Sequence, residues 1–93
     1  MKIGLLTLTL YIPHAQSLKD RRRELRSIKD QLRNRLNVAV AEVGGSELWQ
    51  RTELAITTVS GDAARVDETL TGALKLVERN PSVEALDPHF EVW

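Results

Sequence analysis

The apolar residues of this chain follow two different spacings, and the order in which these spacings alternate restricts the fold more than any other feature. Alternation at every second position, which is typical of a strand, runs through Lys2–Ile12. Spacing by three or four positions, which is typical of a helix with one apolar face, follows over Leu18–Leu36. The rest of the chain repeats this change and predicts strands over Asn37–Val43 and Arg51–Ser60, a helix over Asp62–Arg79 and a strand over Val83–Trp93.

The predicted order is strand, helix, strand, strand, helix, strand. This order predicts an α+β fold of the ferredoxin-like, split βαβ class, with a four-stranded antiparallel sheet and two helices on one face. The Lys2–Ile12 strand is expected at the centre, because both of its faces carry apolar residues, and Pro88 marks the last strand as an edge. A length of 93 residues fits a single domain over residues 1–93.

Local signals place the first helix and the core. Ser17, followed by Asp20 three residues later, predicts a capped helix that begins at Leu18. Gly44 and Gly45 are expected to end the third element and to open a hairpin loop. The core is expected to contain Leu25, Ile28, Leu32, Val66, Leu70 and Val77.

Charge is segregated in this chain. The formal net charge is zero, but the segment from Lys19 to Arg35 has eight basic and three acidic residues, which gives +5 there and −5 elsewhere. Basic side chains three or four residues apart repel one another on a helix, and cations in a first turn oppose the helix dipole. An anionic partner is one explanation, and a solvated helix face with Glu24 and Asp30 as counterions is the other. The predicted contact, here called the basic stripe, consists of Lys19, Arg22, Arg23, Arg26, Lys29 and Arg33.

Catalytic and metal-binding patterns are missing from the sequence. There is no cysteine, and His14 and His89 have no second ligand at helical spacing. Neither a nucleophile elbow nor a phosphate-binding glycine loop occurs. We therefore expect no enzyme activity, no metal and no cofactor. A minor alternative is an acylphosphatase-like phosphatase, in which Arg21 or Arg22 would act with Asn37, although residues 12–16 lack the glycines of such a loop.

Nucleic-acid binding on this fold usually stacks bases on aromatic residues of the central strands. The strand Arg51–Ser60 has no aromatic residue, so binding is expected to use the first helix and to contact phosphates. The free amides after Ser17 form an additional candidate anion seat, and Trp49 is a candidate for stacking on a base. The predicted partner is structured RNA or a ribosomal component.

A second kind of partner is another copy of the chain. Ile3, Leu5 and Tyr11 are expected on the sheet face that the helices leave uncovered, which favours a homodimer through this face, unless Trp93 covers it. The alternative function is therefore a structural or regulatory homo-oligomer, or a protein-interaction module, without nucleic acid. Met1–Ile12 is too short to span a membrane and lacks a signal-peptide pattern, so we expect a cytoplasmic protein with no membrane contact.

Three sequence landmarks carry a family resemblance. They are SLKDRRR at Ser17–Arg23, NVAVAEV at Asn37–Val43 and LWQR at Leu48–Arg51, and in this order they resemble the YlxP-like family of bacterial proteins. The resemblance implies a small ferredoxin-like domain of unknown function whose gene often lies near those for transcription and translation factors, which favours RNA or the ribosome. Gly44 and Gly45 depart from the more acidic connection of that family.

Overall fold

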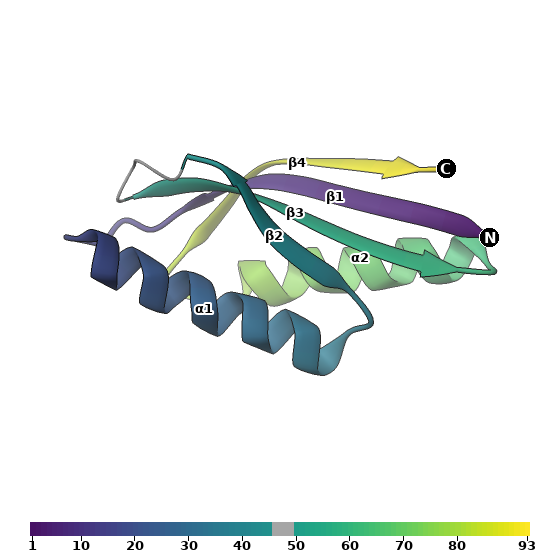
Figure 1. Ribbon diagram of the computed structural model, residues 1–93, viewed down its shortest axis with the longest axis horizontal. Coiled ribbons are helices and arrows are strands. Elements are labelled where there is room, and N and C mark those ends of the chain that lie inside the picture. The colour runs from purple at the N-terminus through teal and green to yellow at the C-terminus, as the bar shows by residue number, and fades with distance from the viewer. Residues whose placement is uncertain (46–49) are drawn as a thin grey trace.

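The fold is an open sheet with two helices on one side, as a computed structural model of residues 1–45 and 50–93 shows (Figure 1). The molecule is elongated, with extents of 42 × 21 × 16 Å. Its elements in chain order are β1 (Lys2–Tyr11), α1 (Leu18–Arg35), β2 (Ala39–Gly44), β3 (Arg51–Ser60), α2 (Ala63–Glu78) and β4 (Glu84–Val92). The order β-α-β-β-α-β and the α+β ferredoxin-like class are therefore confirmed.

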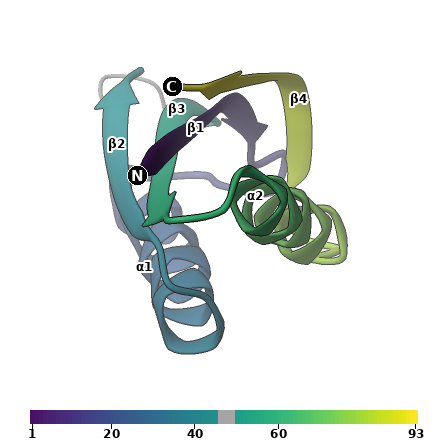
Figure 2. The ribbon, with the colours of Figure 1, turned by 90° about the vertical axis from the view of Figure 1, so that its right-hand side faces the viewer.

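The four strands form one antiparallel sheet in the order β2-β3-β1-β4. β1 is central and β4, with Pro88, is an edge strand, as the sequence predicts. Both helices cover the same face of the sheet, and the opposite face carries no helix (Figure 2). We call this uncovered side the open face.

The core lies between the sheet and the helices. β1 contributes Leu6, Leu8 and Leu10, which are at most 3% exposed, while the residues between them point to the open face. All six predicted core residues on the helices are buried. A Cβ atom at Gly4 would overlap the side chains of Val66 and Leu70, so α2 packs directly against the backbone of β1.

The boundaries of α1 follow from local hydrogen bonds. The Ser17 side chain accepts a hydrogen bond of 3.1 Å from the Asp20 amide, which confirms the predicted cap. The Asp20 carboxylate accepts from the Gln16 amide, one residue earlier than a capping box would place it. At the other end, the Leu36 amide still donates to Leu32, and Leu36 is extended.

β2 begins two residues later than predicted. The Val38 amide donates back to the Leu36 carbonyl, and the Thr58 hydroxyl donates to the Asn37 carbonyl at 2.7 Å. These bonds turn the chain from α1 into the sheet, so β2 begins at Ala39 and not at Asn37.

Apolar side chains remain accessible on the open face. Ile3 and Leu5 are half-buried, whereas Val59 and Trp93 are 52% and 59% exposed. Trp93 exchanges backbone hydrogen bonds of 3.0 and 2.8 Å with Ile3. Its backbone therefore continues β4 alongside β1 and does not cross over the open face. Trp93 therefore extends the apolar surface of the open face instead of covering it.

Candidate functional site

A groove runs between α1 and the edge strand β2, and most of the basic stripe lines it. The groove has a volume of about 550 Å³. We call it the basic groove, and its lining residues are Arg21, Arg22, Leu25, Arg26, Lys29, Asp30, Arg33 and Glu42. Five of these eight side chains are cationic and two are acidic, so the groove attracts anions.

The helical repeat brings four stripe residues into this groove. Arg22, Arg26, Lys29 and Arg33 step by three or four positions along α1, so their side chains follow one line on the helix surface. This line borders the apolar stripe that packs in the core, and it faces β2. The guanidinium of Arg33 donates a hydrogen bond of 3.0 Å to the Val40 carbonyl of β2, which ties the far end of the groove to the strand.

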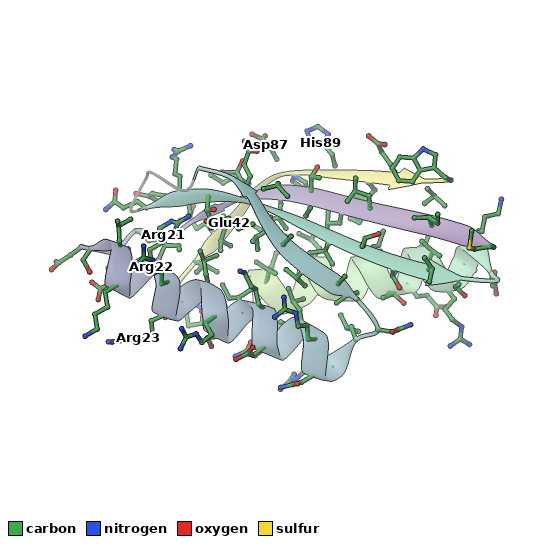
Figure 3. All side chains as sticks on the ribbon, in the orientation of Figure 1. Arg21, Arg22, Arg23, Glu42, Asp87 and His89 are labelled. Atoms are coloured by element: carbon green, nitrogen blue, oxygen red, sulfur yellow. The ribbon has the colours of Figure 1, made fainter. Side chains whose placement is uncertain are left out.

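The near end of the groove is closed by a buried ion pair. Arg21 is only 3% exposed and pairs with Glu42 of β2, whose side chain is 23% exposed. Figure 3 shows these two side chains reaching toward one another from α1 and β2. The guanidinium also donates to the Thr52 hydroxyl at 3.2 Å, and that hydroxyl contacts the Glu42 carboxylate.

Burial lowers the pKa of Arg21, and the neighbouring charge of Arg22 lowers it further. An arginine nevertheless keeps its proton at neutral pH, since its ordinary pKa is far higher. Arg21 is therefore a buried cation whose charge is balanced by Glu42. Because the pair is internally neutral, the attraction of the groove for an anion comes from the remaining four cations, opposed only by Asp30 among the lining residues.

The burial of Arg21 was not predicted from the sequence. The signal was present, because Arg21 lies three positions after Leu18 and four before Leu25, which puts it on the apolar stripe of α1. Its partner Glu42 is 21 positions away in sequence. No local pattern relates the two.

Two stripe residues lie apart from the groove. Lys19 is exposed, and Arg23 lines a smaller hollow of about 170 Å³ together with Asp20 and Glu24. The stripe is therefore divided, with four residues in the groove and two outside it.

The anion seat predicted after Ser17 already has polar groups at the helix end. The Ser17 side chain accepts from the Asp20 amide as the helix cap, and the carboxylate of Asp20 accepts from the Gln16 amide beside it. Trp49 lies outside the described residues.

The residue pair of the phosphatase alternative does not meet. Arg21 and Arg22 are in the first turns of α1, whereas Asn37 follows the far end of this 18-residue helix. At 1.5 Å per residue, the two ends lie roughly 24 Å apart. In the part of the chain that the structure describes, no cluster of three His, Cys, Asp or Glu side chains has the arrangement of a metal site.

A second hollow lies on the open face. It has a volume of about 370 Å³, and its lining includes Thr7, Thr9, Val43, Glu53, Asp87 and His89. Asp87 has a φ of 50° at the irregularity where the pairing of β4 with β1 shifts register. Aspartate tolerates this conformation better than most residues.

Comparison with known proteins identifies the family. The family model described as a protein of unknown function (DUF503) matches residues 3–90. The uncharacterized protein YlxP of Bacillus subtilis (strain 168) is 32% identical over 82 residues, which cover 88% of this chain and 89% of that protein. Within residues 1–45 and 50–93, no helix is both long and apolar enough to cross a membrane. The resemblance to YlxP-like proteins is confirmed, and the chain belongs to the DUF503 family.

Proposed function

We propose that this protein binds the phosphate backbone of RNA, either a structured RNA or the RNA of a ribosomal component, in the basic groove. The observation that carries the proposal is the alignment of Arg22, Arg26, Lys29 and Arg33 along one groove wall in a chain with no net charge. Each like-charged pair at this spacing costs the helix about 0.2–0.5 kcal/mol. A bound polyanion offsets this repulsion, because each cation can then pair with a phosphate.

The dimensions of the cation line suit a short stretch of backbone. Arg22 and Arg33 are eleven residues apart on α1, which corresponds to roughly 16 Å along the helix at 1.5 Å per residue. One strand of duplex DNA carries a phosphate about every 3.4 Å along the axis, and on that measure this length corresponds to about five phosphates. Four cations thus match a comparable number of phosphates. Such contacts supply affinity and position but carry little sequence information.

The central strands β1 and β3 offer no free aromatic surface on which bases could stack. β3 has no aromatic side chain, and on β1 the ring of Tyr11 is already covered by Arg51, whose guanidinium carbon lies 5.4 Å from the ring centroid. Stacking of successive bases across the central strands, as in common single-stranded RNA modules, therefore has no platform here. The groove on the helix side is the better candidate for the contact.

The test is RNA binding by a charge-reversed groove. Replacing Arg22→Glu together with Arg26→Glu should reduce affinity for a fluorescent single-stranded RNA at least 30-fold. The matched control is Arg65→Glu with Lys75→Glu, which makes the same change in net charge at two exposed positions of α2 and should alter affinity less than threefold. Equal losses in both double variants would show that only overall charge matters.

Salt dependence provides an independent readout of the same contact. If four phosphates of a single strand are neutralised, a plot of log K against log salt should have a slope of about −2.8 for the wild type. The groove variant should have a shallower slope, because fewer counterions are released. A wild-type slope near zero would contradict the proposal.

A protein partner with an acidic surface is the alternative occupant of the groove. Nuclease treatment distinguishes the two kinds of partner. It should release the natural partner if the complex depends on RNA, and it should leave a direct protein complex intact. Dimerisation through the open face is a separate proposal. It uses none of the groove residues, so a substitution in the groove should leave dimerisation unchanged.

A further inference from the structure

We propose that the open face is the contact with a second copy of this chain, that the two-fold axis runs along β1, and that Arg51 of each copy pairs with Glu84 of the other. This inference is independent of RNA binding in the basic groove. It rests on the registers of the three strands β3, β1 and β4. Residues directly opposite one another in antiparallel strands project from the same face. The open face is therefore arranged in rows that run across the strands.

The row at one end of the open face is charged at both sides. Arg51 of β3 is opposite Tyr11 of β1, and Tyr11 is opposite Glu84 of β4. Arg51 and Glu84 are both exposed and are separated by two strand spacings, which is about 10 Å. A cation and an anion thus flank an aromatic ring on the central strand.

The row at the other end is apolar. Val59 of β3 is opposite Ile3 of β1, and Ile3 exchanges backbone hydrogen bonds with Trp93. Val59 and Trp93 are more than half exposed. Leu5 adds a further aliphatic side chain in the next row, where it lies between Thr57 of β3 and the exposed Glu91 of β4. The apolar end of the open face therefore consists of the row of Ile3 and of Leu5 on β1.

A two-fold axis along β1 makes these rows complementary. The rotation leaves β1 over β1 of the second copy and brings β3 over the second copy's β4. Arg51 then faces Glu84 of the second copy, and Val59 faces Trp93 of the second copy. Ile3 faces its own counterpart. The pair of Arg51 with Glu84 and the contact of Val59 with Trp93 each occur twice, as isologous association requires.

Other axes give poorer contacts. An axis across the strands would place the row of Val59 and Trp93 on the row of Arg51 and Glu84, which buries charged groups against apolar ones. An axis along β3 would place Arg51 against Arg51 of the second copy. Like charges in direct opposition are unfavourable. Of these three axes, only the one along β1 brings Arg51 against a carboxylate, that of Glu84.

The raised and hollow parts of the open face are compatible with an axis along β1. Asp87 and His89 of β4 rise above the sheet on this side (Figure 3), and the hollow of about 370 Å³ lies beside them, over Thr7, Thr9 and Glu53. With the axis along β1, the raised part of β4 lies over β3 of the second copy. In the row of His89, the residue on β3 is Ala55, whose small side chain leaves space for the raised strand.

The association would give the assembly two separate binding sites. Both helices lie on the side of the sheet opposite to the open face (Figure 2), so the basic groove of each copy remains accessible on the outside of the dimer. Two grooves on one particle can bind one RNA at two places, and the second contact then benefits from a high effective concentration.

The experiment is sedimentation equilibrium of the purified protein without RNA, over about 5–300 µM, together with a charge exchange. The wild type should be dimeric at the upper concentrations. Arg51→Glu and Glu84→Arg should each weaken association at least tenfold, because each places two like charges in opposition. The double variant with both changes should recover association to within threefold of the wild type.

The control is Arg65→Glu on α2, which changes the charge away from the open face and should leave association unchanged. Circular dichroism of every variant reports whether it is folded. A wild type that stays monomeric at 300 µM, or a double variant that associates no better than the single variants, would overturn the proposal. Since no RNA is present, neither result bears on the basic groove.

Discussion

The buried pair of Arg21 and Glu42 should make the two partners unequal in their effect on stability. Glu42→Gln leaves a guanidinium that is 3% exposed without its counterion, and removing one partner of a buried pair costs about 3–5 kcal/mol. Glu42 retains 23% exposure and borders the groove, so we expect the lower end of that range, about 3 kcal/mol. In Arg21→Met the remaining carboxylate keeps access to water, and a loss of about 1–2 kcal/mol is expected.

Urea unfolding followed by circular dichroism measures both losses, with the free energy of unfolding extrapolated to zero denaturant. The double variant Arg21→Met with Glu42→Leu removes both charges and should lose less than Glu42→Gln alone. Its RNA affinity should stay within threefold of the wild type, because Arg21 is already neutralised by Glu42. If Glu42→Gln costs less than 1 kcal/mol, or less than Arg21→Met, the guanidinium does not depend on Glu42 as described.

Two further predictions concern the packing that holds α1 and α2 on the sheet. Leu32→Ala should lower the free energy of unfolding by about 2–5 kcal/mol, because Leu32 is fully buried; a loss below 1 kcal/mol in urea unfolding would mean that the site collapses without a cavity. Gly4→Ala should lower the melting temperature, because the new Cβ would overlap the side chains of Val66 and Leu70. Gly61→Ala is the control, because no atom lies within 4 Å of its new Cβ. If thermal melts rank the two variants in the opposite order, α2 does not approach β1 as closely as described.

The fold could be predicted from the sequence because the patterns that specify each helix and strand are local. Alternation in β1, the spacing of Leu25, Ile28 and Leu32 on α1, and the Ser17 cap each depend on residues within one element. The β2 boundary was less well predicted, since the bonds of Leu36 and Asn37 use the turn and the neighbouring strand.

The candidate site was predicted only in part, because a groove needs two elements. The helical spacing predicts that Arg22, Arg26, Lys29 and Arg33 are neighbours, but it does not show that β2 runs beside them. The pairing of Arg21 with Glu42 joins two elements of the fold, so it follows from the tertiary structure. The same limit explains why Lys19 and Arg23 were included in the stripe and yet lie outside the groove.

The most direct test of the basic groove is recovery of RNA cross-linked to the protein in cells. Wild type, the Arg22→Glu, Arg26→Glu variant and the Arg65→Glu, Lys75→Glu control should be expressed at equal levels and compared after ultraviolet cross-linking. The groove variant should lose most of the recovered RNA, whereas the wild type and the control should recover similar amounts. Equal RNA recovery from all three proteins would contradict the proposal and would make the cations of α1 a solvated helix face.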